Sequence, residues 1–73
     1  MRTVGETRAW ALGELKRAGI DAPALTADLL TGFALGWDRV RILSHPEQEI
    51  DDAARQLVRD LVRRRAGGEP LQY

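Results

Sequence analysis

The sequence predicts an all-α fold, a small bundle of four to five helices with no sheet. Three observations lead to this prediction. Apolar residues recur at intervals of three and four along the longer segments, which is the spacing of one helix face. Isoleucine, valine and threonine are scattered and never alternate with polar residues, so strands have no support. Glycine, proline and aspartate separate the apolar segments, at positions typical of helix ends.

The first helix is expected from Thr3 to Ala18. The residues T-V-G-E from Thr3 to Glu6 match a capping box, in which the hydroxyl and the carboxylate each accept a hydrogen bond from the other's backbone N–H. Gly19 supplies the stop. Apolar residues follow the cap at helical spacing: Val4, Ala11, Leu12, Leu15 and Ala18.

A second helix is expected after Asp21, which we interpret as its N-cap, with Pro23 in the first turn and Gly36 at the end. Its predicted apolar face is wide. It is formed by Ala27, Leu30 and Ala34, with Leu29 and Phe33 on the flank.

Two further helices complete the prediction. A short one is capped by Asp38, places Val40 and Leu43 three residues apart, and stops at His45-Pro46. The last begins at Asp51 and ends at Gly67, and Asp51 and Asp52 favour its amino-terminal dipole. Its buried stripe is predicted to be Ala54, Leu57, Val58, Leu61 and Val62, with Arg55, Arg59 and Arg63 on another face.

The composition is that of a globular domain, with 44% hydrophobic and 30% charged residues in a chain of 73. Eleven basic and eleven acidic residues cancel, which argues against nucleic-acid binding by the domain as a whole. There is no cysteine, no signal-peptide pattern and no apolar run of the roughly 20 residues that cross a bilayer. We therefore expect a cytoplasmic monomer with no membrane partner.

No residue pattern in the chain indicates catalysis. There is no Gly-rich phosphate loop, no serine–histidine–acid set and no metal-ligand cluster. The one histidine, His45, precedes a proline in a predicted loop, and we interpret it as a solvent-exposed residue. We therefore assign no catalytic, cofactor-binding or metal-binding residue.

Partner binding is the remaining class of function. Trp10, Phe33 and Trp37 are large anchors expected in the core, with Trp37 partly exposed beside a helix end. We predict a partner-binding surface formed by Arg55, Arg59, Arg63 and Trp37. Cations are also favourable at a helix carboxyl terminus, so a purely structural role stays open. The alternative function is an independent helical module that binds RNA or DNA through Arg55, Arg59, Arg63, Arg64 and Arg65.

Several of these residues together resemble a known family. They are Ala18-Gly19-Ile20 at a helix end, Ala27-Asp28-Leu29-Leu30, and the terminal run RRRAGGEPLQY. The chain is similar to the amino-terminal domain of the release factor glutamine methyltransferases (the HemK/PrmC family). The specific part is the tail, where the family pattern R-R-x-x-G-E-P-h-x-Y, with h apolar, is matched by Arg64, Arg65, Gly68, Glu69, Pro70, Leu71 and Tyr73. Thr26 departs from the acidic residue common in relatives.

The resemblance implies a division into domains and a function. Residues 1–66 would form a substrate-recognition bundle, and residues 67–73 would begin the linker to an absent catalytic domain that uses S-adenosylmethionine. That enzyme methylates the glutamine of the Gly-Gly-Gln motif in class-one peptide chain release factors. The family's Gly-rich cofactor loop and Asn-Pro-Pro-Tyr motif do not occur here, since the chain contains no G-x-G and no asparagine. We therefore expect the 73 residues alone to be non-catalytic, with a release factor and the catalytic domain as partners.

Overall fold

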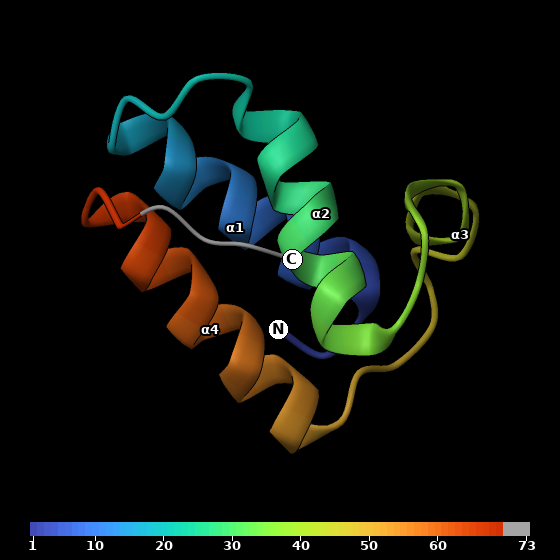
Figure 1. Ribbon diagram of the computed structural model, residues 1–73. Helices are drawn as coiled ribbons and strands as arrows, with labels where there is room; N and C mark the ends of the chain where they lie inside the picture. The colour runs from blue at the N-terminus through green and yellow to red at the C-terminus, as the bar shows by residue number, and fades with distance from the viewer. Residues whose placement is uncertain (70–73) are drawn as a thin grey trace.

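The computed structural model describes residues 1–69, which form four helices packed into a bundle (Figure 1). This confirms the all-α prediction: within residues 1–69 the only β-type pairing is an isolated bridge between Thr3 and Glu49. None of the helices in that range is both long and apolar enough to cross a membrane. The helices are α1 (Val4–Arg17), α2 (Pro23–Leu35), α3 (Arg39–Ser44) and α4 (Asp52–Ala66).

The first helix begins with the predicted capping box. The hydroxyl of Thr3 accepts a hydrogen bond from the Glu6 N–H at 3.2 Å. The Glu6 carboxylate in turn accepts from the N–H groups of Arg2 at 2.9 Å and Thr3 at 3.1 Å. These donors, that of Arg2 foremost, hold the pKa of Glu6 below its usual value of 4.5, because they stabilise the ionised form. The predicted start of the helix is confirmed.

Aspartate caps begin α3 and α4 as predicted. The Arg41 N–H donates to Asp38 at 2.8 Å, and the Ala54 N–H donates to Asp51 at 2.7 Å. The predicted cap of α2 is wrong. Ala22, not Asp21, occupies the N-cap position, in the left-handed region at φ 47°, and no side chain bonds to the first turn. Pro23 has no N–H, so the first helical residue needs no cap.

The same backbone turn ends α1 and α4. After α1, Gly19 has a φ of 73°, and the N–H of Ile20 donates to the Leu15 carbonyl at 3.1 Å. After α4, Gly68 has a φ of 90°, and the N–H of Glu69 donates to the Arg64 carbonyl at 3.1 Å. This is the Schellman pattern, in which a left-handed residue lets the chain reverse while it satisfies the last carbonyls.

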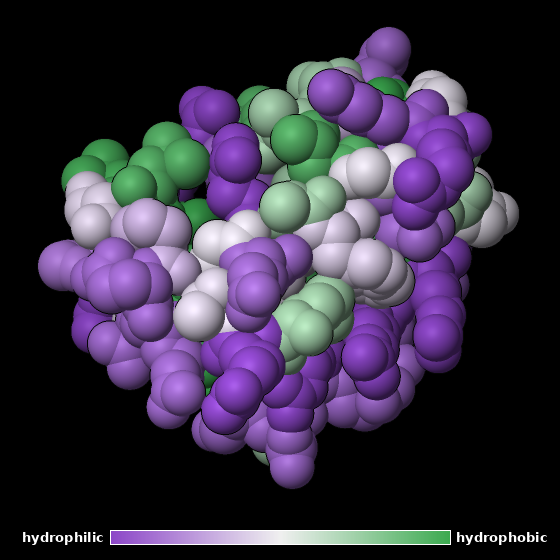
Figure 2. All heavy atoms as spheres, turned by 180° about the vertical axis from the view of Figure 1, so that it is seen from behind, coloured by the Kyte–Doolittle hydropathy of each residue, from purple (hydrophilic) through white to green (hydrophobic). Residues whose placement is uncertain are grey.

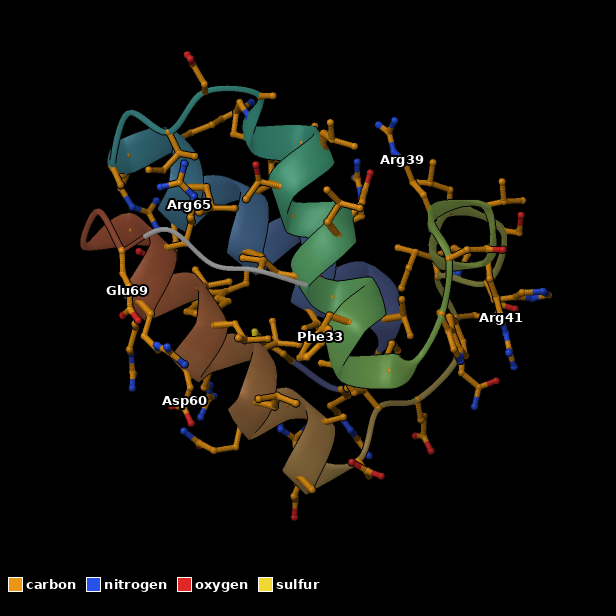
Figure 3. All side chains as sticks on the ribbon, viewed as in Figure 1. Phe33, Arg39, Arg41, Asp60, Arg65 and Glu69 are labelled. Atoms are coloured by element: carbon orange, nitrogen blue, oxygen red, sulfur yellow. The ribbon has the colours of Figure 1, made fainter. Side chains whose placement is uncertain are left out.

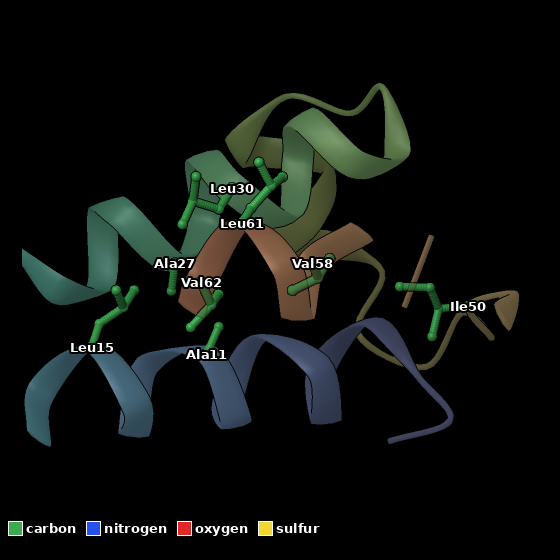
Figure 4. Close-up of a cluster of buried hydrophobic side chains, with 8 residues drawn as sticks. All are labelled: Ala11, Leu15, Ala27, Leu30, Ile50, Val58, Leu61 and Val62. Carbon is green, nitrogen blue, oxygen red and sulfur yellow. The ribbon is translucent and has the colours of Figure 1, made fainter. Parts of the chain in front are cut away.

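The core lies where α1, α2 and α4 meet (Figure 4). Full burial of a side chain the size of valine or leucine stabilises the fold by about 1.5–3 kcal/mol, so this cluster is the main source of stability. Trp10 packs against it from the edge, partly buried, as an anchor. The buried members are Ala11, Leu15, Ala27, Leu30, Ile50, Val58, Leu61 and Val62.

Parts of the predicted apolar faces are wrong. Leu29 and Phe33 on α2 are exposed, and Thr26 and Thr31 are buried in their place. Leu57 on α4 is also partly exposed. The reason is that α2 packs against α1 and α4 along one stripe that includes its threonines. The apolar flank of α2, which hydropathy alone places in the core, therefore points outward.

The short helix α3 is exposed on its predicted apolar side. Val40 and Leu43 face outward, and Ile42 alone is buried. α3 packs against α2 and α1 but has no contact with α4. Seen from behind, apolar surface gathers over α3, while charged and polar side chains dominate the lower part of the molecule (Figure 2).

The first residues of the chain are tied to the connection between α3 and α4. The Val4 N–H donates to the Gln48 carbonyl at 2.8 Å, and the Ile50 N–H donates to the Arg2 carbonyl at 2.9 Å. These bonds satisfy backbone groups that no helix uses. The connection from His45 to Asp51 is thereby held against the bundle.

Candidate partner-binding surface

Arg55, the first residue of the predicted surface, is bound within the molecule. Its guanidinium forms an ion pair with Asp52 and donates a hydrogen bond to the Met1 carbonyl at 2.6 Å. Only 23% of the side chain is exposed. Arg55 therefore fastens the amino-terminal segment to α4, and little of its charge faces a partner.

Arg59 and Arg63 lie one and two turns further along α4. Arg63 is exposed and Arg59 is half-buried. Within the described part of the chain, neither side chain forms an ion pair or a hydrogen bond. Their planar guanidinium groups remain available to a carboxylate or phosphate.

The arginine run at the end of α4 is partly neutralised by its own chain. Arg64 donates to the Glu69 carboxylate from Nε at 3.1 Å and from Nη2 at 2.6 Å. This bidentate contact lowers the pKa of Glu69. With Arg55 also engaged, the five-arginine cluster of the nucleic-acid alternative is interrupted at two positions.

Trp37 lies in the connection between α2 and α3, away from the arginines of α4. It is half-buried, as predicted. The guanidinium of Arg41 lies over its ring, 4.3 Å from the centroid, and the His45 ring meets it edge-on at 6.3 Å. Because α3 has no contact with α4, the structure divides the predicted surface into two separate parts.

Gly32 fixes the position of this connection. The N–H of Trp37 donates to the Gly32 carbonyl at 2.8 Å. A Cβ atom on Gly32 would lie 2.4 Å from the Trp37 carbonyl oxygen. The backbone after α2 therefore passes so close to the helix that only glycine fits.

Asp28 is the polar residue that sequence reasoning missed. Its side chain has no exposed surface, and it forms ion pairs with Arg8 of α1 and Arg39 of α3. The Arg39 Nε donates at 2.8 Å. The only signal in the sequence was a single charged residue in the otherwise uncharged segment of α2. Asp28 thus joins three helices through one buried carboxylate, and it orients α3.

The predicted linker residues are only partly within the described range. Gly68 and Glu69 form the turn after α4, and their contacts fix the direction in which the chain leaves the bundle. Pro70, Leu71 and Tyr73 lie outside the described residues. The expected boundary between bundle and linker at residues 66–67 stays a prediction, although α4 ends at Ala66.

Comparison with known protein families identifies the bundle. Residues 6–73 match the model of the PrmC N-terminal domain. The chain belongs to this family. The PrmC N-terminal domain was the family indicated by the tail residues, so that prediction is confirmed. No solved structure matches the chain.

Relatives with this domain carry one name, release factor glutamine methyltransferase. The protein from Nitratidesulfovibrio vulgaris is 41% identical over 59 residues, which are 81% of this chain and 20% of that protein. The protein from Moorella thermoacetica is 40% identical over 67 residues, 86% of this chain and 24% of the relative. The protein from Burkholderia pseudomallei is 37% identical over 71 residues, which are 97% of this chain and 24% of that protein. The chain thus spans a fifth to a quarter of the length of these relatives.

Proposed function

We propose that this chain is the substrate-recognition domain of a protein-glutamine methyltransferase that uses S-adenosylmethionine. The enzyme would methylate the glutamine of the Gly-Gly-Gln motif in class-one release factors, in the cytoplasm. The observation that carries the proposal is the match of residues 6–73 to the PrmC N-terminal domain, together with relatives named for this activity. The catalytic residues and the cofactor would belong to the following domain.

The bundle suits recognition more than chemistry. A protein substrate is held over an area far larger than one side chain, and a rigid helix surface supplies such an area. Binding energy collected at a distance from the reacting amide can orient it beside the methyl donor. The described contacts leave Arg59, Arg63 and Arg65 of α4 without an ion pair, and we assign Arg59 and Arg63, one turn apart, to an acidic region of the release factor.

The proposal is tested with the longer protein that carries this domain. Methyl transfer from labelled S-adenosylmethionine to a release factor is measured for the unaltered protein and for the double variant Arg59→Glu, Arg63→Glu. We expect the KM for the release factor to rise while the Kd for the cofactor stays unchanged. The matched control is Lys16→Glu with Arg17→Glu, which makes the same charge change at the exposed end of α1.

Four outcomes would contradict the proposal or a part of it. An unchanged KM in the α4 variant would remove Arg59 and Arg63 from the substrate surface. An equal rise in the control would show a general charge effect. Activity on the release factor that survives deletion of residues 1–66 would reject the recognition role altogether. RNA binding that weakens steeply with salt and is lost in the α4 variant would favour the nucleic-acid alternative.

A further inference from the structure

The exposed face of α2 is apolar along its whole length. Three residues of α2 are exposed, and all three are large hydrophobic residues one turn apart: Leu25 at 41%, Leu29 at 37% and Phe33 at 54%. An ordinary surface helix presents polar and charged side chains on its outer face. Here the one charged residue of the helix, Asp28, is buried. The outer face of α2 therefore has the character of an interface.

Leu57 of α4 extends this face across the helix boundary. Leu30 of α2 and Leu61 of α4 lie next to each other in the core, and the two helices run in opposite directions (Figures 1 and 4). Leu57 lies one turn before Leu61, and Phe33 lies about one turn after Leu30. Because the helices are antiparallel, Leu57 and Phe33 are displaced in the same direction from the contact between Leu30 and Leu61. Leu57 is 38% exposed. We call Leu25, Leu29, Phe33 and Leu57 the α2–α4 apolar face.

The chain leaves the bundle from the end of α4, on the side where α2 begins. In Figure 1, α2 and α4 converge where α2 ends and α4 begins, and they diverge toward the end where the chain leaves α4. Figure 3 places Phe33 between the two helices in the same view. The Schellman turn at Gly68 and the bidentate contact between Arg64 and Glu69 fix the direction of departure. Whatever follows residue 69 is tethered to the bundle at the end where α2 begins.

We infer that the α2–α4 apolar face is the surface on which the following domain of the same polypeptide packs. The inference rests on the proposed function, since it takes the missing three-quarters or more of the relatives' length as that domain. A domain joined to the bundle by the same chain meets this face at a high effective concentration, whereas a separate partner must be captured from solution. The face has no charged member, while the available arginines of α4 lie elsewhere. The bundle thus separates a surface for its own chain from a surface for the substrate.

Hydroxyl-radical footprinting of Phe33 tests this inference. The 73-residue chain and the longer protein are oxidised under the same conditions, without release factor. We expect Phe33 to react several-fold more slowly in the longer protein. Val40 and Leu43 of α3, which are 73% and 50% exposed, are the internal controls and should react equally in both.

Each other outcome overturns the inference. Equal oxidation of Phe33 in the two proteins would show that the following domain leaves the face uncovered. Protection that appears only after release factor is added would assign the face to the substrate. Protection in the 73-residue chain that grows with its concentration would assign it to a second copy. None of these results affects the KM test above, so a failure here is distinct from a failure of the proposed function.

A pair of variants gives a second measurement. Leu29→Glu on α2 and Leu43→Glu on α3 place the same charge on comparably exposed positions. Both should leave the 73-residue chain folded, because neither side chain is buried. In the longer protein, Leu29→Glu alone should accelerate protease cleavage after Arg65. Equal cleavage of both variants would contradict the inference.

Discussion

Gly32 and Gly13 lie within helices of the same bundle, yet the substitution of each by alanine should have opposite effects. Alanine favours a helix interior over glycine by about 1 kcal/mol. In Gly13→Ala the new Cβ would meet only the Arg17 guanidinium, at 3.7 and 3.8 Å, which is ordinary contact. Gly13→Ala should therefore stabilise the domain by about 1 kcal/mol.

In Gly32→Ala the gain in helix propensity is outweighed by a clash with backbone. The new Cβ would lie 2.4 Å from the Trp37 carbonyl oxygen, a separation that real Cβ atoms essentially never show. Overpacking of this kind costs about 1–3 kcal/mol. Relief would also weaken the hydrogen bond from the Trp37 N–H to Gly32, which contributes about 1 kcal/mol. The expected net effect is destabilisation by about 1–3 kcal/mol.

Urea unfolding followed by far-ultraviolet circular dichroism measures both variants. In thermal unfolding, 1 kcal/mol corresponds to a Tm shift of about 4–8 °C in a domain of this size. Gly13→Ala should therefore raise the Tm of the chain and Gly32→Ala should lower it, and the Tm values of the two variants should differ by at least about 4–8 °C. If Gly32→Ala is as stable as Gly13→Ala, then the close approach of the connection to α2 does not limit stability, and the reasoning is wrong.

Three further predictions concern polar groups. Asp28→Asn should destabilise the domain by about 1.5–3 kcal/mol, because Arg8 and Arg39 lose the buried carboxylate that accepts their hydrogen bonds. An unchanged urea midpoint would contradict this prediction. The hydroxyl of Thr31 is buried with no hydrogen-bond partner in the described residues, so Thr31→Val should stabilise by about 1 kcal/mol in the same assay. The lowered pKa of Glu6 stabilises the fold above pH 4.5, and this contribution is lost as the pH falls through the lowered pKa. Glu6→Gln should therefore be less stable than the unaltered chain at neutral pH and equally stable in acid. The same difference in the free energy of unfolding at both pH values would contradict this prediction.

The helix ends could be predicted from the sequence because their determinants are local. A hydroxyl or carboxylate that caps an N–H two or three residues away does so whatever the rest of the chain does, as at Thr3, Asp38 and Asp51. The exception, Asp21, shows the limit of such reasoning. A left-handed residue at Ala22 followed by proline starts α2 without a side-chain cap, and no propensity predicts a left-handed alanine.

The candidate surface was harder to predict because it depends on which residues meet. Asp28 has partners 20 residues before it and 11 after it, and spacing alone does not indicate either. Arg55 appeared free in sequence but is bound to Asp52 and Met1. Trp37 was grouped with the arginines by residue type, whereas the packing of α3 away from α4 separates them. Leu29 and Phe33 were placed in the core because hydropathy does not distinguish a core from an interface.

The backbone bonds between residues 2–4 and the connection after α3 decide where the domain can be shortened. Removing a few residues ahead of a first helix is usually harmless in a small domain, because such residues are commonly loose. Here it would remove the bonds from Val4 to Gln48 and from Ile50 to Arg2, and the connection would keep only the bond from the Gly5 N–H to the Pro46 carbonyl and the buried Ile50 side chain. The short helix α3, with Trp37 beside it, would then depend more on the ion pair between Arg39 and Asp28 and on the burial of Ile42. A shortened form of this domain should therefore keep residue 1, and any fusion partner needs a spacer that leaves the Met1 carbonyl free to accept the hydrogen bond from Arg55.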